Sequence, residues 1–292
     1  MPPITSMLPQ NLLRGFAVLL LTVAASVLGA VEFERTGGPY VPTPQAVVDA
    51  MLDFAKVGPR DFVIDLGSGD GRIILTAAQR YNARGFGVDI DPELVQQSNA
   101  EAQRRGLGER VSFREQDVMQ ARIGDASVVT LYLLPGMMQS LQTKFLSELR
   151  PGTRIVSHDF PFADWKPDRQ ADVSVPEKYG TAGNWKSTIF YWVVPAQLQG
   201  VWHVSVPELA SQPLAVTFEQ QFQYVEGHAT MRGKRVNIAD GKLEGDRVRF
   251  KLVINGAAYD FRGTVEGDRM QGEAVRAART LGWTATKGGA RL

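Results

Sequence analysis

Between Pro44 and Pro195, short apolar runs alternate with stretches in which apolar residues recur every three or four positions. The apolar runs predict buried strands, and the three-to-four spacing predicts amphipathic helices. Their alternation is typical of parallel βαβ units in a sheet that is covered on both faces. The predicted helices cover residues 44–55, 72–81, 92–105 and 137–149, and the predicted strands cover 61–66, 85–90, 111–115, 127–134 and 153–158. Two later runs, 173–175 and 187–194, have no helix between them and predict a closing antiparallel pair.

The pattern changes after Pro195, where short alternating segments are separated by glycine-containing turns. Asn255-Gly256 lies between two such segments, 250–254 and 257–261, which is a strong signal for a β-hairpin. We expect a small antiparallel sandwich or barrel of about seven or eight strands here. Its expected core contains the aromatic residues Trp202, Phe218, Phe222 and Trp283. The predicted fold is therefore a Rossmann-like α/β domain over residues 40–195, followed by an all-β domain of unknown role over 200–292.

The N-terminal residues have a different character. Arg14 is the one charged side chain in residues 1–15, and residues 16–31 carry no charge. This pattern predicts a signal peptide or an uncleaved membrane anchor over residues 1–31, with membrane contact through residues 12–31. The positive-inside rule then places the rest of the chain in the periplasm or another extracytoplasmic space, or at the membrane. The alternatives are a buried globular helix and an anchor that leaves both domains on the cytoplasmic side.

Charge and composition exclude several classes of function. The chain has 32 Lys and Arg against 31 Asp and Glu, so it lacks the basic excess of a dedicated nucleic-acid binder. It has no cysteine, which excludes disulfides, thiolate zinc sites and a cysteine nucleophile. The three histidines share no metal-ligand spacing, so we expect no histidine-based metal site, whereas a site made of carboxylates stays open.

The candidate chemistry lies in a glycine-rich loop between the first predicted strand and the helix that follows it. The loop reads Asp-Leu-Gly-Ser-Gly-Asp-Gly over residues 65–71. Its glycines allow a sharp turn and close approach to a ligand, and the helix start offers free N–H groups. Asp65 and Asp70 would repel a pyrophosphate, but they suit a ligand with an amino group or a sulfonium.

Two further acids follow the next strands. Asp89 ends the second strand, where it is placed for the hydroxyls of a ribose. Asp117 follows the third strand and is suited to an adenine amino group, with Val118 beside it to stack on the ring. Each acid alone is equally well explained as a solvated loop residue, but the complete set in this order indicates a nucleoside site.

With these motifs the sequence resembles the class I S-adenosylmethionine-dependent methyltransferases. The resemblance covers Tyr40 to Pro195 and rests on residues 65–71, on Gly-Val-Asp-Ile-Asp at 87–91 and on Glu-Gln-Asp-Val at 115–118. It implies a seven-stranded sheet whose last strand is antiparallel, with S-adenosyl-L-methionine as the methyl donor. The residues that it assigns to the donor are Tyr40, Thr43, Asp65, Gly67, Ser68, Gly69, Asp70, Gly71, Asp89, Ile90, Asp117 and Val118.

A narrower resemblance is to the ATP synthase c-subunit lysine N-methyltransferases and their bacterial relatives. Its carriers are Pro-Tyr-Val-Pro-Thr-Pro at residues 39–44 and Tyr-Leu-Leu-Pro at 132–135. Bacterial relatives share Ser-His-Asp-Phe at 157–160 and Asp-Trp at 164–165. This likeness implies a protein substrate that is methylated on a lysine. The all-β half lies outside it.

Methyl transfer is an in-line displacement, so the enzyme mainly aligns donor and acceptor and excludes water. We expect Tyr132 and Pro135, after the fourth strand, to position the acceptor, although ordinary packing explains Tyr132 equally well. Asp159 is suited either to taking the amine's proton or to capping a loop, and the cap is favoured. His158 is expected to be structural rather than a base.

Two other segments have two interpretations each. Tyr40 and Thr43 fold over the donor as a lid, or they belong to a plain linker. Trp165 closes an acceptor channel, or it packs, which is the favoured interpretation. Two rival functions also stay open at this point. One is an exported or membrane-anchored binding protein that has lost catalysis, and the other is a nicotinamide oxidoreductase, which Asp65 and Asp70 disfavour.

Overall fold

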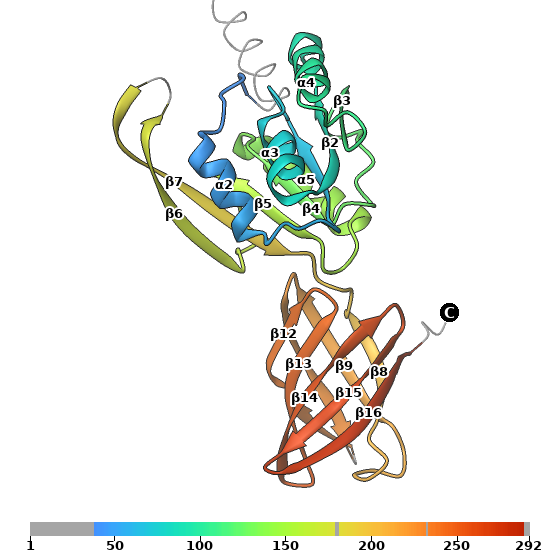
Figure 1. Ribbon diagram of the computed structural model, residues 1–292. Coiled ribbons are helices and arrows are strands. Elements are labelled where there is room, and N and C mark those ends of the chain that lie inside the picture. The colour runs from blue at the N-terminus through green and yellow to red at the C-terminus, as the bar shows by residue number, and fades with distance from the viewer. Residues whose placement is uncertain (1–37, 179–180, 232, 289–292) are drawn as a thin grey trace, which may run out of the picture.

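The computed structural model describes residues 38–178, 181–231 and 233–288. The predicted signal peptide or anchor over residues 1–31 lies outside these ranges. Within them, no helix is both long enough and apolar enough to cross a bilayer. The chain forms two sheets that lie one beyond the other, joined by a short segment after residue 193 (Figure 1).

The first sheet has seven strands in the described part of the chain, in the order β3-β2-β1-β4-β5-β7-β6. Strands β1 to β5 run parallel, and β7 is antiparallel to both of its neighbours. This topology confirms the predicted methyltransferase sheet and its closing antiparallel pair. The strands are β1 (Phe62–Leu66), β2 (Arg84–Asp89), β3 (Val111–Glu115), β4 (Val128–Leu131), β5 (Arg154–His158), β6 (Arg169–Lys178) and β7 (Thr181–Val193).

Helices cover both faces of this sheet, as the buried runs in the sequence predict. The core on one face contains residues of α2 (Gln45–Phe54), α3 (Arg72–Tyr81) and α4 (Pro92–Arg104). The core on the other face contains residues of α5 (Pro135–Glu148). Successive residues of one strand enter opposite cores, as Val63 and Ile64 do, because side chains of a strand alternate between its faces.

Helix α5 begins two residues before the predicted start at residue 137, and β4 is shorter than the predicted strand over 127–134. Leu134 is the extended N-cap residue, and Pro135 is the first helical residue. Proline is well suited to that position because its missing N–H would have no partner inside the helix. Pro135 therefore belongs to a helix start rather than to a strand end.

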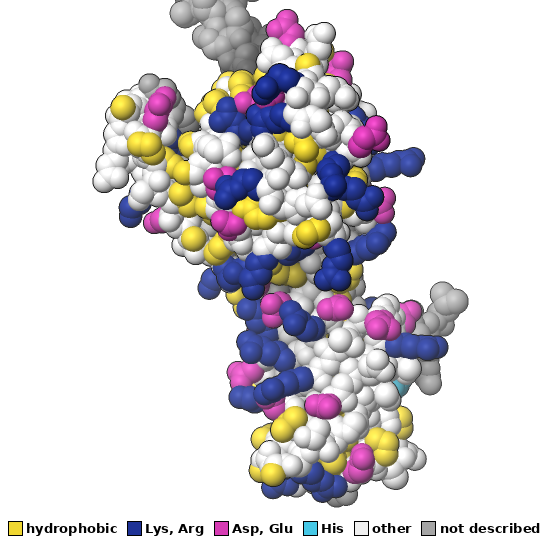
Figure 2. Space-filling model, in the orientation of Figure 1, with side chains coloured by type: hydrophobic (Ala, Val, Ile, Leu, Met, Phe, Trp, Pro, Cys, Tyr) yellow, Lys and Arg dark blue, Asp and Glu magenta, His cyan; other side chains and the backbone are white. Residues whose placement is uncertain are grey.

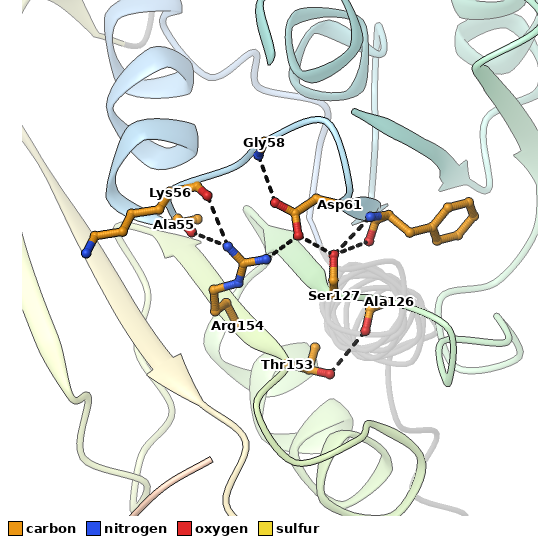
Figure 3. A network of polar contacts seen from close by, with 9 residues as sticks. Ala55, Lys56, Gly58, Asp61, Ala126, Ser127, Thr153 and Arg154 are labelled. Carbon is orange, nitrogen blue, oxygen red and sulfur yellow. Dashed lines mark hydrogen bonds and ion pairs between the residues drawn. The ribbon is translucent and has the colours of Figure 1, made fainter. Parts of the chain in front are cut away.

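A polar network fixes the N-terminal ends of the central strands (Figure 3). Asp61 accepts hydrogen bonds from the backbone N–H of Gly58 at 2.8 Å and from the Ser127 hydroxyl at 2.7 Å, and it pairs with Arg154. Arg154 also donates to the backbone oxygen of Ala55 at 2.6 Å. These contacts connect the segments before β1, β4 and β5 at one edge of the sheet, and the opposite edge is left for a binding site.

The second sheet is a closed antiparallel barrel. Among the described residues it has nine strands, more than the seven or eight predicted, in the order β11-β10-β12-β13-β14-β15-β16-β8-β9, and β10 also pairs with β9. Strands β11 and β12 pair one after the other with the same edge of β10, so together they fill one place in the barrel. The strands are β8 (Gly200–Ser205), β9 (Leu214–Gln221), β10 (Tyr224–Met231), β11 (Lys234–Asn237), β12 (Ala239–Glu244), β13 (Arg247–Ile254), β14 (Ala257–Glu266), β15 (Arg269–Arg276) and β16 (Arg279–Lys287).

The barrel interior is filled by side chains. Trp202, Phe218 and Trp283 lie in its core, as predicted. The hairpin at Asn255-Gly256 is also confirmed, because Ile254 pairs with Ala257 and both turn residues have positive φ.

The prediction for Phe222 was wrong. Phe222 is at the turn between β9 and β10 with φ +53°, and its ring packs against the core of the first sheet instead of the barrel core. It stacks on Trp165 with a centroid separation of 5.5 Å.

Candidate active site

A cavity of about 470 Å³ lies at the carboxyl ends of the central parallel strands. This is the edge where open α/β sheets bind ligands. Eleven of the twelve residues predicted to contact the donor line it: Tyr40, Thr43, Asp65, Gly67, Ser68, Gly69, Asp70, Asp89, Ile90, Asp117 and Val118. Gly71 does not line it, because it is the N-terminal cap of α3 and faces Phe113.

A larger, more open hollow of about 1110 Å³ lies on the outer face of the barrel and contains none of the predicted site residues. Its walls carry both signs of charge, for example Arg249, Arg262 and Glu273. Basic and acidic side chains are likewise interspersed over the face of the barrel seen in Figure 2. The smaller cavity is the candidate site, because it is where the strand-end acids meet.

The glycine loop is shaped for close approach. Gly67, Gly69 and Gly71 all have positive φ, and a Cβ at Gly69 would lie 2.5 Å from the ring of Tyr40. The backbone N–H groups of Gly67 and Ser68 both donate to the Val88 oxygen at 2.9 Å, which ties the loop to β2. The loop thus brings the backbone to the cavity wall without a side chain in between.

Asp65, in β1, is a buried carboxyl group on the cavity wall. Its side chain accepts a hydrogen bond of 2.7 Å from the Thr130 hydroxyl of β4. Burial raises the pKa of Asp65 to about 7; the Thr130 bond lowers it, and the charges of Asp89 and Asp70 raise it further. A cation beside Asp65 would stabilise its ionised form, so this position favours a positively charged ligand group.

Asp89 ends β2 and is oriented by the backbone. One of its carboxylate oxygens accepts from Gly69 N–H at 2.7 Å, and the other accepts from Asp91 N–H at 3.0 Å. An ionised carboxylate has acceptor sites beyond these two, so it is able to take two ligand hydroxyls as well. Asp117 lies after β3 and is fixed in a similar way, by a 2.8 Å bond from Met119 N–H.

Arg72 was not predicted from the sequence, but it organises one wall of the cavity. It forms an ion pair with Asp70 at 2.6 Å and donates to the backbone oxygen of Thr43 at 2.8 Å. Partial burial opposes ionisation of Asp70, but the hydrogen bonds and charge of Arg72 outweigh it and lower the Asp70 pKa. Burial and Asp70 together raise the pKa of Tyr40 to about 12. Residues 40–43 are thus held against the glycine loop, and Asp70 has a counterion of its own.

The predicted acceptor residues occupy different places. Tyr132 and Leu133 line the cavity after β4, as does Met137 of α5, whereas Pro135 is not among the lining residues. The ring of Tyr132 lies 4.0 Å from that of His158, centroid to centroid, and is parallel to Phe160 at 6.1 Å. This end of the cavity is therefore mostly apolar and aromatic.

His158 and Asp159 lie behind this wall. The buried His158 ring contacts the Thr43 hydroxyl at 3.3 Å and the Ser187 hydroxyl at 2.9 Å. Burial lowers the pKa of His158 to about 4, with Asp159 raising it and Lys178 lowering it, so the ring is neutral near pH 7. Asp159 accepts from Thr188 N–H at 2.9 Å and pairs with Lys178 at 2.6 Å, outside the cavity lining. These contacts favour the structural histidine and the loop cap over proton transfer.

Comparison with known proteins agrees with this geometry. The family model of the ANTKMT methyltransferase domain matches residues 65–169. A protein-lysine N-methyltransferase of Saccharolobus islandicus is 40% identical over 157 residues, which are 53% of this chain and 93% of that protein. The chain belongs to the ANTKMT methyltransferase family. It is therefore an S-adenosylmethionine-dependent methyltransferase, and S-adenosylmethionine is its methyl donor.

A further relative and a solved structure also match this chain. The adenine nucleotide translocase lysine N-methyltransferase of Mus musculus is 35% identical over 129 residues, 44% of this chain and 56% of that protein. An RNA methyltransferase from Salinibacter ruber, solved with S-adenosyl-L-homocysteine, is 43% identical with a TM-score of 0.48, covering 54% of this chain and 96% of that one.

The family match ends at residue 169, so the barrel lies outside it. The alternative of a binding protein that has lost catalysis finds no support in these comparisons. In the described part of the chain, no group of three or more His, Asp or Glu residues is arranged to hold a metal ion.

Proposed function

We propose that this chain binds S-adenosylmethionine in the cavity below residues 40–43 and transfers its methyl group to a lysine amine of a protein. The observation that carries the proposal is the meeting of Asp65, Asp89 and Asp117 in one cavity whose far wall contains Tyr132. The three acids come from positions that are 24 and 28 residues apart in the sequence. The sheet brings them together because parallel strands present their carboxyl ends at one edge.

The lining residues fit the parts of the donor. Asp65 is suited to the donor's ammonium group because it is buried, lies on the cavity wall and has a raised pKa. Asp89 is suited to the ribose hydroxyls because both of its oxygens are already aimed by backbone N–H groups. Asp117, Val118 and Ile90 are suited to the adenine, the first by hydrogen bonding and the other two by apolar contact with the ring.

When bound, S-adenosylmethionine supplies a methyl group on a sulfonium, and attack by the amine lone pair breaks the carbon–sulfur bond and leaves S-adenosylhomocysteine. The chain must align the acceptor nitrogen with that bond and keep water out. Tyr132, Leu133 and Met137 form the apolar wall where this alignment takes place. Such a wall favours the neutral, nucleophilic form of a lysine amine, because burial lowers a lysine pKa. The methylated amine then loses its proton to solvent.

The lysine acceptor rests on the relatives. The names of several specify lysine methylation of a protein, namely adenine nucleotide translocase in one case and the ATP synthase c-subunit in others. The archaeal relative, which this chain covers almost completely, is named a protein-lysine methyltransferase without a stated substrate. A protein lysine is therefore the acceptor class that we propose.

Calorimetric titration of the full chain with S-adenosylmethionine tests the donor site. We expect saturable binding that Asp89→Asn weakens, while Asp125→Asn, at an exposed acid that does not line the cavity, leaves binding intact. NADH in the same cell tests the oxidoreductase alternative and is expected to give no heat. Absence of donor binding by folded protein would refute the assigned site.

Methyl transfer to poly-L-lysine tests the acceptor class, with a poly-L-lysine whose amines are already fully methylated as the matched control. We expect mass increments of one methyl group on the first polymer and none on the second. Transfer to neither polymer by protein that binds the donor would contradict a general lysine acceptor.

A further inference from the structure

One segment runs from the candidate active site to the barrel. This is the β5–β6 connection, residues 159–168. Because β5 and β6 are both antiparallel to β7, they run parallel to each other, and the connection must return along the sheet. It begins after His158, which pairs with Ile189, and ends at Asp168, which accepts from Val193 N–H at 2.9 Å. It therefore spans the height of β5, from the cavity end to the barrel end.

The barrel contacts the C-terminal end of this connection, residues 165–168. Gln223, in the turn just before β10, is 1% exposed and accepts a hydrogen bond from the Trp165 indole at 3.0 Å. Its amide donates to the Lys166 backbone oxygen at 2.8 Å. Phe222 stacks on Trp165 with an angle of 10° between the rings. Lys242 of β12 lies 3.8 Å from Asp168.

The middle of the connection is buried against α5 and the sheet. Phe162 stacks on Trp165 with centroids 5.3 Å apart and contacts Phe145 of α5 edge-on at 5.9 Å. The indole of Trp192, in β7, donates to the Trp165 backbone oxygen at 2.8 Å. Because Phe162 and Trp165 are 3% and 0% exposed, the segment is a packed part of the core rather than a free loop.

The N-terminal end of the connection, residues 159–160, lies beside the cavity wall that contains Tyr132. Phe160 is parallel to Tyr132 at 6.1 Å, and its backbone oxygen accepts from the Ser157 hydroxyl at 2.6 Å. Asp159 has φ +60° and is fixed by Thr188 and Lys178. Close-packed side chains transmit displacement. A displacement of the C-terminal end of the connection would therefore move Phe160, which packs against Tyr132.

We infer that the barrel positions the acceptor wall of the active site, and that Phe222 and Gln223 are positioning residues that act through the β5–β6 connection on Tyr132. The inference rests on the proposed function, since it takes Tyr132 as part of the acceptor wall. It gives a role to the half of the chain that the family match does not cover. The donor acids are not on this connection, so the effect is confined to acceptor alignment.

The test compares Phe222→Ala and Gln223→Ala with the wild-type full chain. Tyr224→Ala is the matched control, because Tyr224 follows directly in sequence and is 41% exposed. Phe222→Tyr is the conservative rescue, because it keeps a ring for stacking on Trp165. The first readout is hydrogen–deuterium exchange, which needs no acceptor. The amides of Asp159 and Phe160, which bond to Thr188 and His158, should exchange faster by about tenfold, the effect of weakening one buried hydrogen bond.

The second readout separates donor binding from transfer. Calorimetric affinity for S-adenosylhomocysteine should change less than about twofold, while kcat for methyl transfer to poly-L-lysine falls by about tenfold or more, as small misplacements of reacting groups do. Phe222→Tyr should restore both exchange and kcat, and Tyr224→Ala should change neither.

Several results would overturn the inference. The inference is wrong if hydrogen–deuterium exchange at residues 159–160 is unchanged in both alanine variants. It is also wrong if donor affinity and kcat fall equally. If an alanine variant fails to fold, Phe222→Leu takes its place, because it removes the ring and keeps apolar volume. Should wild-type protein bind no donor, the proposed function fails, whereas the exchange result still decides whether the barrel supports the connection.

Discussion

Replacing Asp65 by asparagine should make the protein more stable and at the same time remove donor binding. Asp65 is a buried carboxyl group whose pKa is raised from 3.8 to about 7, chiefly by burial. Below pH 3.8 it is protonated in both the folded and the unfolded chain, so it adds no pH dependence there. Between pH 3.8 and 7 the unfolded chain loses this proton more readily, and ionisation therefore favours unfolding.

The destabilisation by ionised Asp65 is complete above pH 7. The change from 3.8 to about 7 corresponds to roughly 4 kcal/mol of lost stability, taken as an upper limit. Asparagine has nearly the same shape, keeps an oxygen that accepts from Thr130, and removes the repulsion by Asp89 and Asp70. We expect Asp65→Asn to raise the free energy of unfolding by about 1–4 kcal/mol at pH 8, with a gain that shrinks toward pH 4.

Urea unfolding at pH 5 and pH 8, followed through exchange of the β1 amides, measures this gain in the first sheet alone. Asp89→Asn is the control, because Asp89 is partly exposed and bonded to backbone N–H groups. Saturating S-adenosylmethionine should stabilise the wild type and leave Asp65→Asn unchanged, since only the former binds it. A variant that is less stable than wild type at pH 8, or equally shifted at both pH values, would refute the reasoning.

The donor cavity and the N-terminal segment give four further expectations. Donor affinity of the wild type should fall about tenfold from pH 8 to pH 6 in calorimetry, because the ionised fraction of Asp65 falls from about nine-tenths to about one-tenth, and equal affinity at the two pH values would contradict this role of Asp65. Tyr132→Ala should leave donor affinity nearly unchanged while methyl transfer falls by about tenfold or more, and a parallel loss of affinity would contradict its assignment to the acceptor wall. Gly69→Ala should abolish donor binding in the same titration, because its Cβ would meet the Tyr40 ring at 2.5 Å at a φ of +51°, whereas Gly106→Ala, also at positive φ but with open space around it, should bind normally. A reporter fused to Leu292 should be active outside the cytoplasm if residues 12–31 act as predicted, and activity inside would contradict that topology.

The sequence was sufficient to predict the donor acids because their arrangement depends on chain order alone. Asp65, Asp89 and Asp117 each follow or end a parallel strand, and parallel strands end at one edge of the sheet. The pairing of Arg72 with Asp70 was not predictable in this way, since it depends on the side-chain directions at the first turn of α3. That pairing matters, because it leaves Asp65 as the buried acid suited to a cation.

Phe222 shows another limit of the pattern. Its position in an alternating apolar segment places it in the barrel core, but a positive φ at the turn directs it to Trp165 instead. The extra strand in the barrel has a similar origin, because β11 and β12 are consecutive in sequence and share one edge of β10. Contacts between distant parts of the chain decide both outcomes, and hydrophobic periodicity reports only local structure.

The strand order also determines when each half can form during synthesis. Strand β7 is the last of its sheet in sequence but lies between β5 and β6, so the sheet is incomplete until residue 193 has left the ribosome. The barrel closes only when β16 pairs with β8, almost at the end of the chain. Because domains fold as they emerge, the first sheet is complete while the barrel is still open. A chain that stops early in the barrel would carry a finished methyltransferase sheet joined to exposed strand edges, which are prone to pair with other chains and aggregate.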